Sequence, residues 1–202
     1  MPEPVSGPVT GKTLVAGVGN IFQRDDAFGV EVIRLLADRP VPPGVKIADF
    51  GIRGVHLVYE LLDGCDLFVL VDAAQRGCPP GTITVLEVQP TDMASPSGVM
   101  DAHGLAPDQV FAMLDSMGSR PGRSLVVACE PADVTAGMGL SDQVREALPH
   151  AVRTVEKILE QGQRKRRRTM STLIKVAVVA GVVAVVVSSL PDIKRYVEIT
   201  QM

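Results

Sequence analysis

The chain has 202 residues, of which 46% are apolar and 21% charged, so it can bury the core of one ordinary domain and is not globally disordered. Residues 163–202 carry eight basic and two acidic side chains, whereas residues 1–162 carry 12 basic and 21 acidic ones. An acidic body with a basic tail argues against nucleic acid as the partner of the body.

Apolar runs and helical patterns alternate along the first part of the chain. Short apolar runs predict strands over Thr13 to Gly19, Val45 to Phe50 and Leu67 to Asp72, the last being continuous until its final carboxylate. Apolar residues at helical spacing predict helices over Ala27 to Asp38 and Val55 to Leu62. Aromatic residues are only 3% of the chain, so aliphatic side chains must fill the core, as in buried parallel strands.

The same alternation continues in the second part. We predict an edge strand over Thr82 to Val88 and a loop over 89–104. A helix over Pro107 to Met117 and a strand over Ser124 to Cys129 follow. The last helix is predicted from Ser141 toward Gln161, with a break at Pro149. Strands that alternate with helices indicate a three-layer α/β/α domain over residues 1–162, with a mainly parallel sheet of about five strands.

The tail, residues 163–202, is a different kind of sequence. The basic run Arg164 to Arg168 precedes an apolar stretch, Leu173 to Leu190, that is slightly short for a membrane span. One interpretation is an apolar helix that tethers the body to the inner face of the membrane, with the basic run on the cytoplasmic side. The other is a segment packed on the body or on a partner. The sequence from Met170 also resembles the start of a separate small protein, which suggests a fusion.

The cysteines and the N-terminus indicate a cytoplasmic body. Cys65, Cys78 and Cys129 are odd in number and widely spaced, so they fit neither a zinc site nor a redox motif, and we expect them to pack as small apolar side chains. Residues 1–12 lack the apolar stretch of a secretory signal peptide. We therefore expect the body to be cytoplasmic, with or without the membrane tether.

Carboxylates stand where predicted parallel strands end. Asp25 and Asp26 follow the first strand and precede a helix, where one of them is expected to cap the helix. Asp72 ends a buried strand and therefore lies at the edge where open α/β sheets place their ligands, although capping of the next loop is the simpler alternative. The glycines Gly17 and Gly19 form only a weak nucleotide signal, because Phe22 occupies the place of the third glycine of a dinucleotide fingerprint.

Histidine is scarce, and one of the three histidines lies in a polar loop. His103 is in that loop, whereas His56 lies in a predicted amphipathic helix and His150 follows Pro149, so we expect the latter two at the surface. Taken alone, His103 is equally well explained as an ordinary loop residue.

These motifs together resemble the NiFe-hydrogenase maturation proteases, a family of endopeptidases that process the C-terminus of the hydrogenase large subunit. The resemblance rests on Gly17 to Gly29 (GVGNIFQRDDAFG), Asp49 to Gly54 (DFGIRG), Val69 to Ala73 (VLVDA), Pro79 to Thr82 and His103 to Leu105 (HGL), and it runs from about Thr13 to Leu159. The order and spacing of the motifs make the resemblance specific, although each motif alone is less so.

The resemblance implies the site and the substrate. It makes Asp26, Asp72 and His103 the metal-contacting and catalytic set, and we add Asp49 and Asp25 as candidate supporting acids. Oxygen and nitrogen donors of this kind suit Ni²⁺, which in this family is supplied by the substrate, the immature large subunit. No organic cofactor is expected. The alternatives are a non-catalytic nickel-binding assembly factor with the same fold and a nucleoside hydrolase, and the second is disfavoured by the lack of a phosphate-binding loop and stacking aromatics.

Overall fold

The computed structural model describes residues 11–88 and 107–164. The chain divides into two compact units, Met1–Leu159 and Glu160–Met202, and only the end of a helix, residues 160–164, is described in the second. His103, the predicted loop 89–104 and the predicted apolar helix of the tail lie outside the described residues, so the predictions made for them stay predictions. Within the described ranges no helix is both long and apolar enough to cross a membrane.

The elements of the first unit alternate as the sequence predicts. They are β1 (Thr13–Val18), the short 3-10 helix η1 (Arg24–Ala27), α1 (Phe28–Ala37), β2 (Val45–Gly51), α2 (Gly54–Leu62), β3 (Leu67–Ala73), β4 (Ile83–Val88), α3 (Pro107–Ser116) and β5 (Arg123–Cys129). A last helix follows over residues 142–164. The predicted three-layer α/β/α fold with five strands is confirmed.

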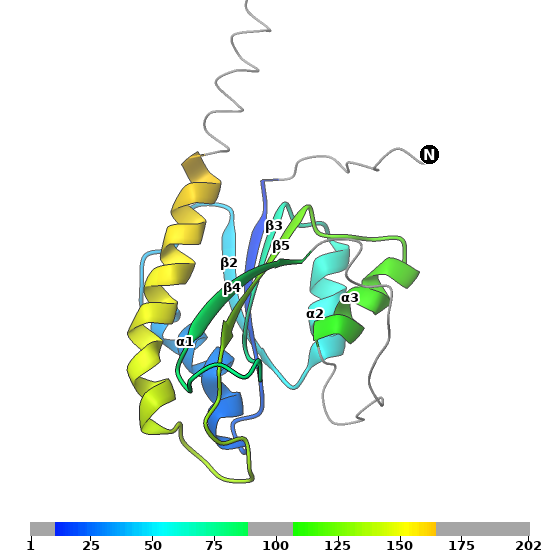
Figure 1. The fold of residues 1–202 in the computed structure, drawn as a ribbon. Helices are drawn as coiled ribbons and strands as arrows, with labels where there is room; N and C mark the ends of the chain where they lie inside the picture. Colours follow the sequence, from blue (N-terminus) through cyan, green and yellow to red (C-terminus); the bar gives the residue numbers. More distant parts are fainter. Residues whose placement is uncertain (1–10, 89–106, 165–202) are drawn as a thin grey trace, which may run out of the picture. The chain divides into compact units, whose positions relative to one another are not determined.

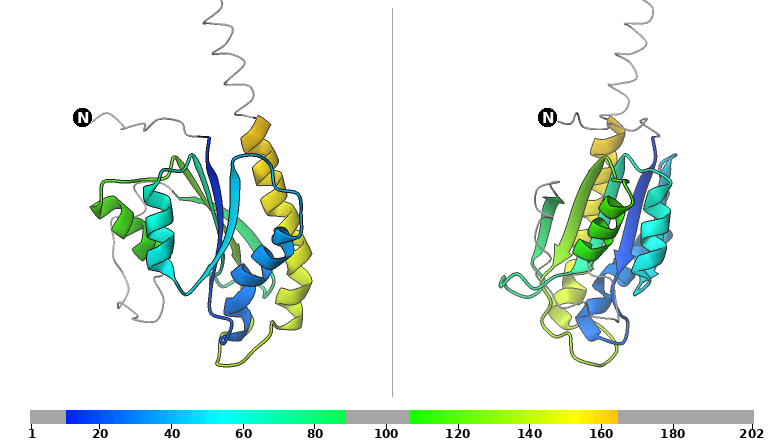
Figure 2. Two further views of the ribbon diagram at one scale, coloured as in Figure 1. Left: turned by 180° about the vertical axis from the view of Figure 1, so that it is seen from behind. Right: turned by 90° about the vertical axis from the view of Figure 1, so that its right-hand side faces the viewer.

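One five-stranded sheet forms the middle layer, in the order β2-β1-β3-β5-β4. β1, β2, β3 and β5 are parallel, and β4 runs antiparallel at the edge beside β5. α1 and residues 142–159 of the last helix cover one face, and α2 and α3 cover the other, as Figure 1 and the views from behind and from the side in Figure 2 show. Since helices cover both faces, the central strands must be apolar on both sides.

β3 shows how its sequence meets this demand. Its first five residues, Leu67 to Val71, are all buried. Val69 and Val71 point toward the layer of α1, whereas Phe68 and Leu70 point toward α2 and α3, because successive side chains of a strand alternate between its faces. The ring of Phe68 meets that of Phe111 of α3 edge to face, with 5.8 Å between centroids.

The predicted break at Pro149 is wrong. Residues 142–164 form one continuous helix, although a proline inside a helix removes one hydrogen bond and costs about 3 kcal/mol. Pro149 is exposed, whereas other residues of the same helix, among them Val144, Val152 and Val155, are fully buried against the sheet. Burial of several aliphatic side chains at about 1.5–3 kcal/mol each outweighs the lost bond.

Candidate active site at the carboxyl edge of the sheet

The chain leaves the sheet in opposite directions after β1 and after β3. From β1 it passes through α1 to β2 on one side, and from β3 it passes to β4 and β5 on the other. The point at which neighbouring parallel strands diverge in this way is where open α/β sheets bind their ligands. Asp26, in η1 after β1, and Asp72, at the end of β3, both lie at this point.

Two glycines bring η1 and α1 close enough to the strands to reach this point. A Cβ on Gly29 would lie 2.2 Å from the backbone oxygen of Val71 and 2.3 Å from that of Val18. A Cβ on Gly17 would lie 2.4 Å from the backbone oxygen of Gly29. Only glycine permits such an approach of helix to strand. The first turn of α1 therefore sits directly on β1 and β3, and the preceding Asp26 comes beside the end of β3.

The negative charge of Asp26 acts on the carboxyl group of Asp72. The Oδ2 atom of Asp26 accepts a hydrogen bond from the backbone N–H of Asn20 at 2.6 Å, and Oδ1 of Asp72 accepts one from the N–H of Ala73 at 2.8 Å. Burial, and then the negative charge of Asp26, raise the pKa of Asp72 to about 8. A cation bound by both side chains would offset the repulsion that disfavours the ionised form of Asp72.

Two members of the predicted metal-contacting set lie in the described part of the chain. Asp26 and Asp72 come together, and His103 lies outside the described residues. Within the described ranges no three His, Cys, Asp or Glu side chains are clustered as metal ligands. The donor chemistry of the two carboxylates fits a divalent ion with open coordination positions, to which a third ligand would be added.

Asp25, which the sequence suggested as a supporting acid, holds the loop after β5 in place. Its side chain is fully buried and accepts four hydrogen bonds from the loop after β5, namely from the N–H groups of Ala132 (2.8 Å), Asp133 (2.9 Å) and Ser141 (2.6 Å) and the hydroxyl of Ser141 (2.9 Å). Burial alone would raise the pKa of Asp25, but these hydrogen bonds lower it below its ordinary value. Ser141 begins the last helix, as predicted, and its hydroxyl binds Asp25.

Asp49 stands at the carboxyl end of β2, opposite Gly17 of β1. Its side chain is exposed, and its backbone oxygen accepts a hydrogen bond from the guanidinium of Arg53 at 2.8 Å. β1 separates β2 from β3, so Asp49 is placed at the margin of the site rather than beside Asp72. Its proposed supporting role stays a prediction.

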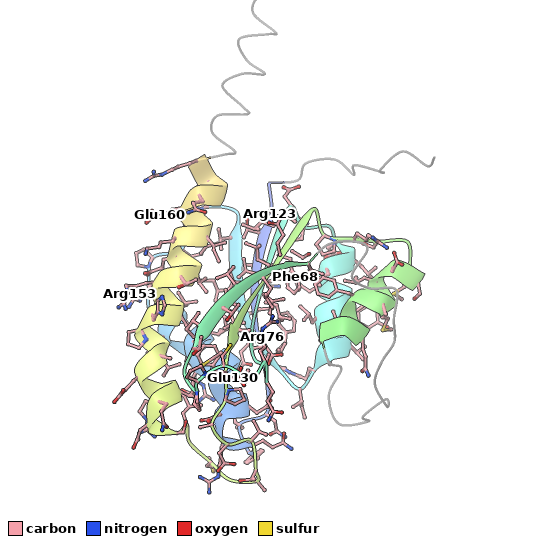
Figure 3. All side chains as sticks on the ribbon, viewed as in Figure 1. Phe68, Arg76, Arg123, Glu130, Arg153 and Glu160 are labelled. Carbon is pink, nitrogen blue, oxygen red and sulfur yellow. The ribbon has the colours of Figure 1, made fainter. Side chains whose placement is uncertain are left out.

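Glu130 lies at the same carboxyl edge of the sheet, although the sequence patterns described above did not single it out. It directly follows β5, is 8% exposed, and accepts hydrogen bonds from the backbone N–H groups of Arg76 (2.8 Å) and Gly77 (3.2 Å) (Figure 3). Burial opposes ionisation, but these bonds and others lower the pKa of Glu130. It thus fixes the loop that leaves β3 next to Asp72. The signal was available, since Glu130 immediately follows a buried apolar strand, much as Asp72 follows the five buried residues of β3.

Cys65 and Cys129 pack in the core as predicted, whereas Cys78 is only half-buried and belongs to neither core cluster, and all three are free thiols. Cys65 and Cys129 are buried, which raises the pKa of both thiols, that of Cys129 to about 12. A neutral thiol is a poor nucleophile, so neither cysteine suits covalent catalysis. The exposed positions predicted for His56 and His150 are confirmed.

Comparison with known proteins identifies relatives for the body and, separately, for the tail. The sequence profile of the family described as hydrogenase maturation protease matches residues 30–158. The profile of a family of unknown function matches residues 171–202. The two matches do not overlap, so the tail gives no information about the activity of the body.

Individual relatives point the same way. The hydrogenase expression/formation protein HupD of Rhizobium leguminosarum is 30% identical over 161 residues, which is 79% of this chain and 79% of that protein. The coenzyme F420 hydrogenase subunit delta of Methanothermobacter thermautotrophicus is 31% identical over 73% of this chain and 94% of its own length. Among solved structures, the hydrogenase maturating endopeptidase HybD from E. coli shares 27% identity with a TM-score of 0.64, covering 74% of this chain and 93% of that one.

Proposed function

Because the chain belongs to the hydrogenase maturation protease family, we propose that it removes the C-terminal extension from the nickel-loaded large-subunit precursor of a NiFe-hydrogenase. Its relatives of known structure include endopeptidases of this kind at 26–27% identity, and the chain is a peptidase of the same fold. The observation that supports the proposal most directly is the pair Asp26 and Asp72 at the divergence of β1 and β3.

The carboxylate pair suits a test for nickel in the substrate. In this proposal Asp26 and Asp72, with His103 as implied by the family resemblance, contact a nickel ion that arrives already bound to the precursor. Two oxygen donors and one imidazole leave coordination positions that the ligands of the precursor can occupy. An empty precursor supplies no cation to stabilise the ionised pair, so it binds less well and is not cleaved.

The chemistry follows from the same arrangement. The nickel of the substrate polarises the carbonyl of the bond to be cleaved, and a carboxylate of the protein orients and deprotonates the attacking water, which makes the reaction an aspartyl-type hydrolysis. Asp26 and Asp72 are the candidates for this step, and Asp49, at the margin of the site, is the candidate supporting acid. Asp25 takes no part, because the loop after β5 occupies both of its oxygens.

The test is cleavage of the precursor with and without nickel, followed by mass spectrometry of its C-terminus. We expect a loss of mass with the nickel-loaded precursor only. The variants Asp26→Asn, Asp72→Asn and His103→Ala should each lower the cleavage rate at least about 100-fold, as is usual for loss of an acid–base group. Asp142→Asn, on the exposed start of the last helix, is the matched control. Wild-type rates in all three site variants would refute the assignment.

The alternative function, a non-catalytic nickel-binding assembly factor, makes a different prediction in the same experiment. Such a protein would bind the nickel-loaded precursor tightly and leave its mass unchanged. The family membership and the retention of both carboxylates favour the peptidase.

A membrane tether formed by residues 173–190 is a separate proposal, and it concerns residues outside the described part of the chain. Cell fractionation of the full chain and of a chain that ends at Gln163 tests it. Equal distribution of both between the membrane and the aqueous fraction would eliminate the tether.

A further inference from the structure

Large apolar side chains are exposed at the same edge of the sheet as the carboxylates. In the described part of the chain, four large hydrophobic side chains are more than half exposed: Met138 (74%), Phe22 (62%), Tyr59 (59%) and Ile52 (55%). Tyr59 lies on α2, and the other three lie in the loops that follow β5, β1 and β2. A single exposed apolar residue needs no explanation, but three around one site do.

The loops of Phe22 and Met138 are joined by their backbones. The N–H of Gly137 donates to the oxygen of Phe22 at 2.9 Å, and the N–H of Arg24 donates to the oxygen of Gly137 at 3.1 Å. Gln23 and Gly137 pair as in a short parallel sheet. Phe22 and Met138 are therefore neighbours, although more than a hundred residues separate them in the sequence.

Ile52 is connected to the same group from the other side. The N–H of Gly19 donates to the oxygen of Gly51 at 3.1 Å, so the loop after β2, with Ile52, lies beside the loop after β1. Asp26 lies within this arrangement, because its carboxylate accepts the N–H of Asn20, which follows Gly19. The loops after β2, β1 and β5 thus lie side by side, and Asp26 lies beside them. We call their three exposed apolar side chains, Phe22, Ile52 and Met138, the apolar rim.

The loops that carry Phe22 and Met138 are held in place by buried and charged contacts. Asp25 binds the loop after β5 through four hydrogen bonds, and the guanidinium of Arg24 lies 3.2 Å from the carboxylate of Asp133. A surface that is fixed before binding loses little conformational entropy when a partner arrives. Exposed apolar side chains on fixed loops are the usual features of a binding surface.

We propose that the apolar rim binds apolar residues of the precursor's C-terminal segment, next to the bond that is cleaved. The inference rests on the proposed function and adds a substrate-binding surface to it. A polypeptide substrate fits the position of the rim, because its backbone must reach Asp26 and Asp72 while its side chains rest on the loops around them. A second copy of this chain on the rim would instead cover the carboxylates and block cleavage.

The experiment measures binding of nickel-loaded large-subunit precursor to the full-length protein and, separately, the steady-state rate of cleavage. Met138→Ser, Phe22→Ser and Ile52→Ser should each raise the Kd and the KM several-fold, and the triple variant about 100-fold, with kcat changed less than about threefold. Met138→Leu, which keeps the apolar surface, should bind the precursor with the Kd of the wild type. Met117→Ser is the matched control, since Met117 is 48% exposed and follows α3 at the opposite edge of the sheet.

The outcomes separate this inference from the proposed function. Cleavage by the wild type with an unchanged Kd and KM in the triple variant would overturn the role of the rim and leave the function intact. An equal rise of Kd in Met117→Ser would also overturn it, as would a change in self-association, measured by sedimentation, without a change in precursor binding. If the wild type binds the precursor through the rim but never cleaves it, the proposed function fails and the binding surface stands.

Discussion

Replacing Asp25 by alanine tests which of two adjacent carboxylates holds the fold together. A hydrogen bond to a charged acceptor contributes about 1.5–3 kcal/mol, and breaking a buried charged network costs about 3–5 kcal/mol. Asp25 accepts four such bonds, and the exposed loop lets water replace some of them. We therefore expect Asp25→Ala to lower the free energy of unfolding by about 3–4 kcal/mol and the Tm by about 10 °C. For Asp26→Ala, with one bond to Asn20 from a half-buried carboxylate, we expect about 1.5 kcal/mol, the lower end of that range.

The measurement is urea unfolding followed by circular dichroism at several pH values. Hydrogen bonds lower the pKa of Asp25 in the folded state, so its contribution is fully present above its unfolded pKa of about 3.9 and is lost as the pH falls through the lowered folded value. The difference between the wild type and Asp25→Ala should shrink only in that acid range. A cost at pH 7 no greater than that of Asp26→Ala would refute the structural role of Asp25.

Three further predictions concern the same edge of the sheet. Gly29→Ala should cost about 2–4 kcal/mol in thermal unfolding and abolish cleavage, because its Cβ would meet the backbone oxygens of Val18 and Val71; unchanged stability would contradict this close approach. In nickel-free protein, the free energy of unfolding of Asp72→Asn should rise relative to that of the wild type as the pH rises from about 4 to about 8. The raised pKa of Asp72 makes the folded wild type bind more protons than its unfolded chain in that window, so the wild type loses stability as the pH rises. Parallel curves of stability against pH would contradict this. Glu130→Ala should speed hydrogen exchange in the loop after β3 while that of β1 stays slow.

Local sequence was sufficient to predict the elements of the body. The strand of Leu67 to Val71 is apolar throughout because helices cover both its faces, so its type and its central place followed from composition alone. Pro149 was misjudged for the opposite reason. The low helix propensity of proline predicts a break. Only the burial of apolar side chains along about four turns of the helix shows why it continues.

The site was predictable in part. A carboxylate at the end of a buried parallel strand must lie at the carboxyl edge of the sheet, so Asp72 could be placed from the sequence, and Glu130 could have been placed by the same rule. The proximity of Asp26 to Asp72 depends on the close packing of Gly29 on two strands, which no local pattern displays.

What the sequence by itself determined is the alternation of strands and helices, the family resemblance and the chemical types at the strand ends, since these depend on residues close together in the chain. Only the tertiary structure decided which member of the pair Asp25 and Asp26 is structural. The two are neighbours of one chemical type, and they differ because Asp25 meets Ser141, 116 residues away, whereas Asp26 turns toward Asn20. The apolar rim was hidden for the same reason, because Phe22 and Met138 become neighbours only when the loops after β1 and β5 pair.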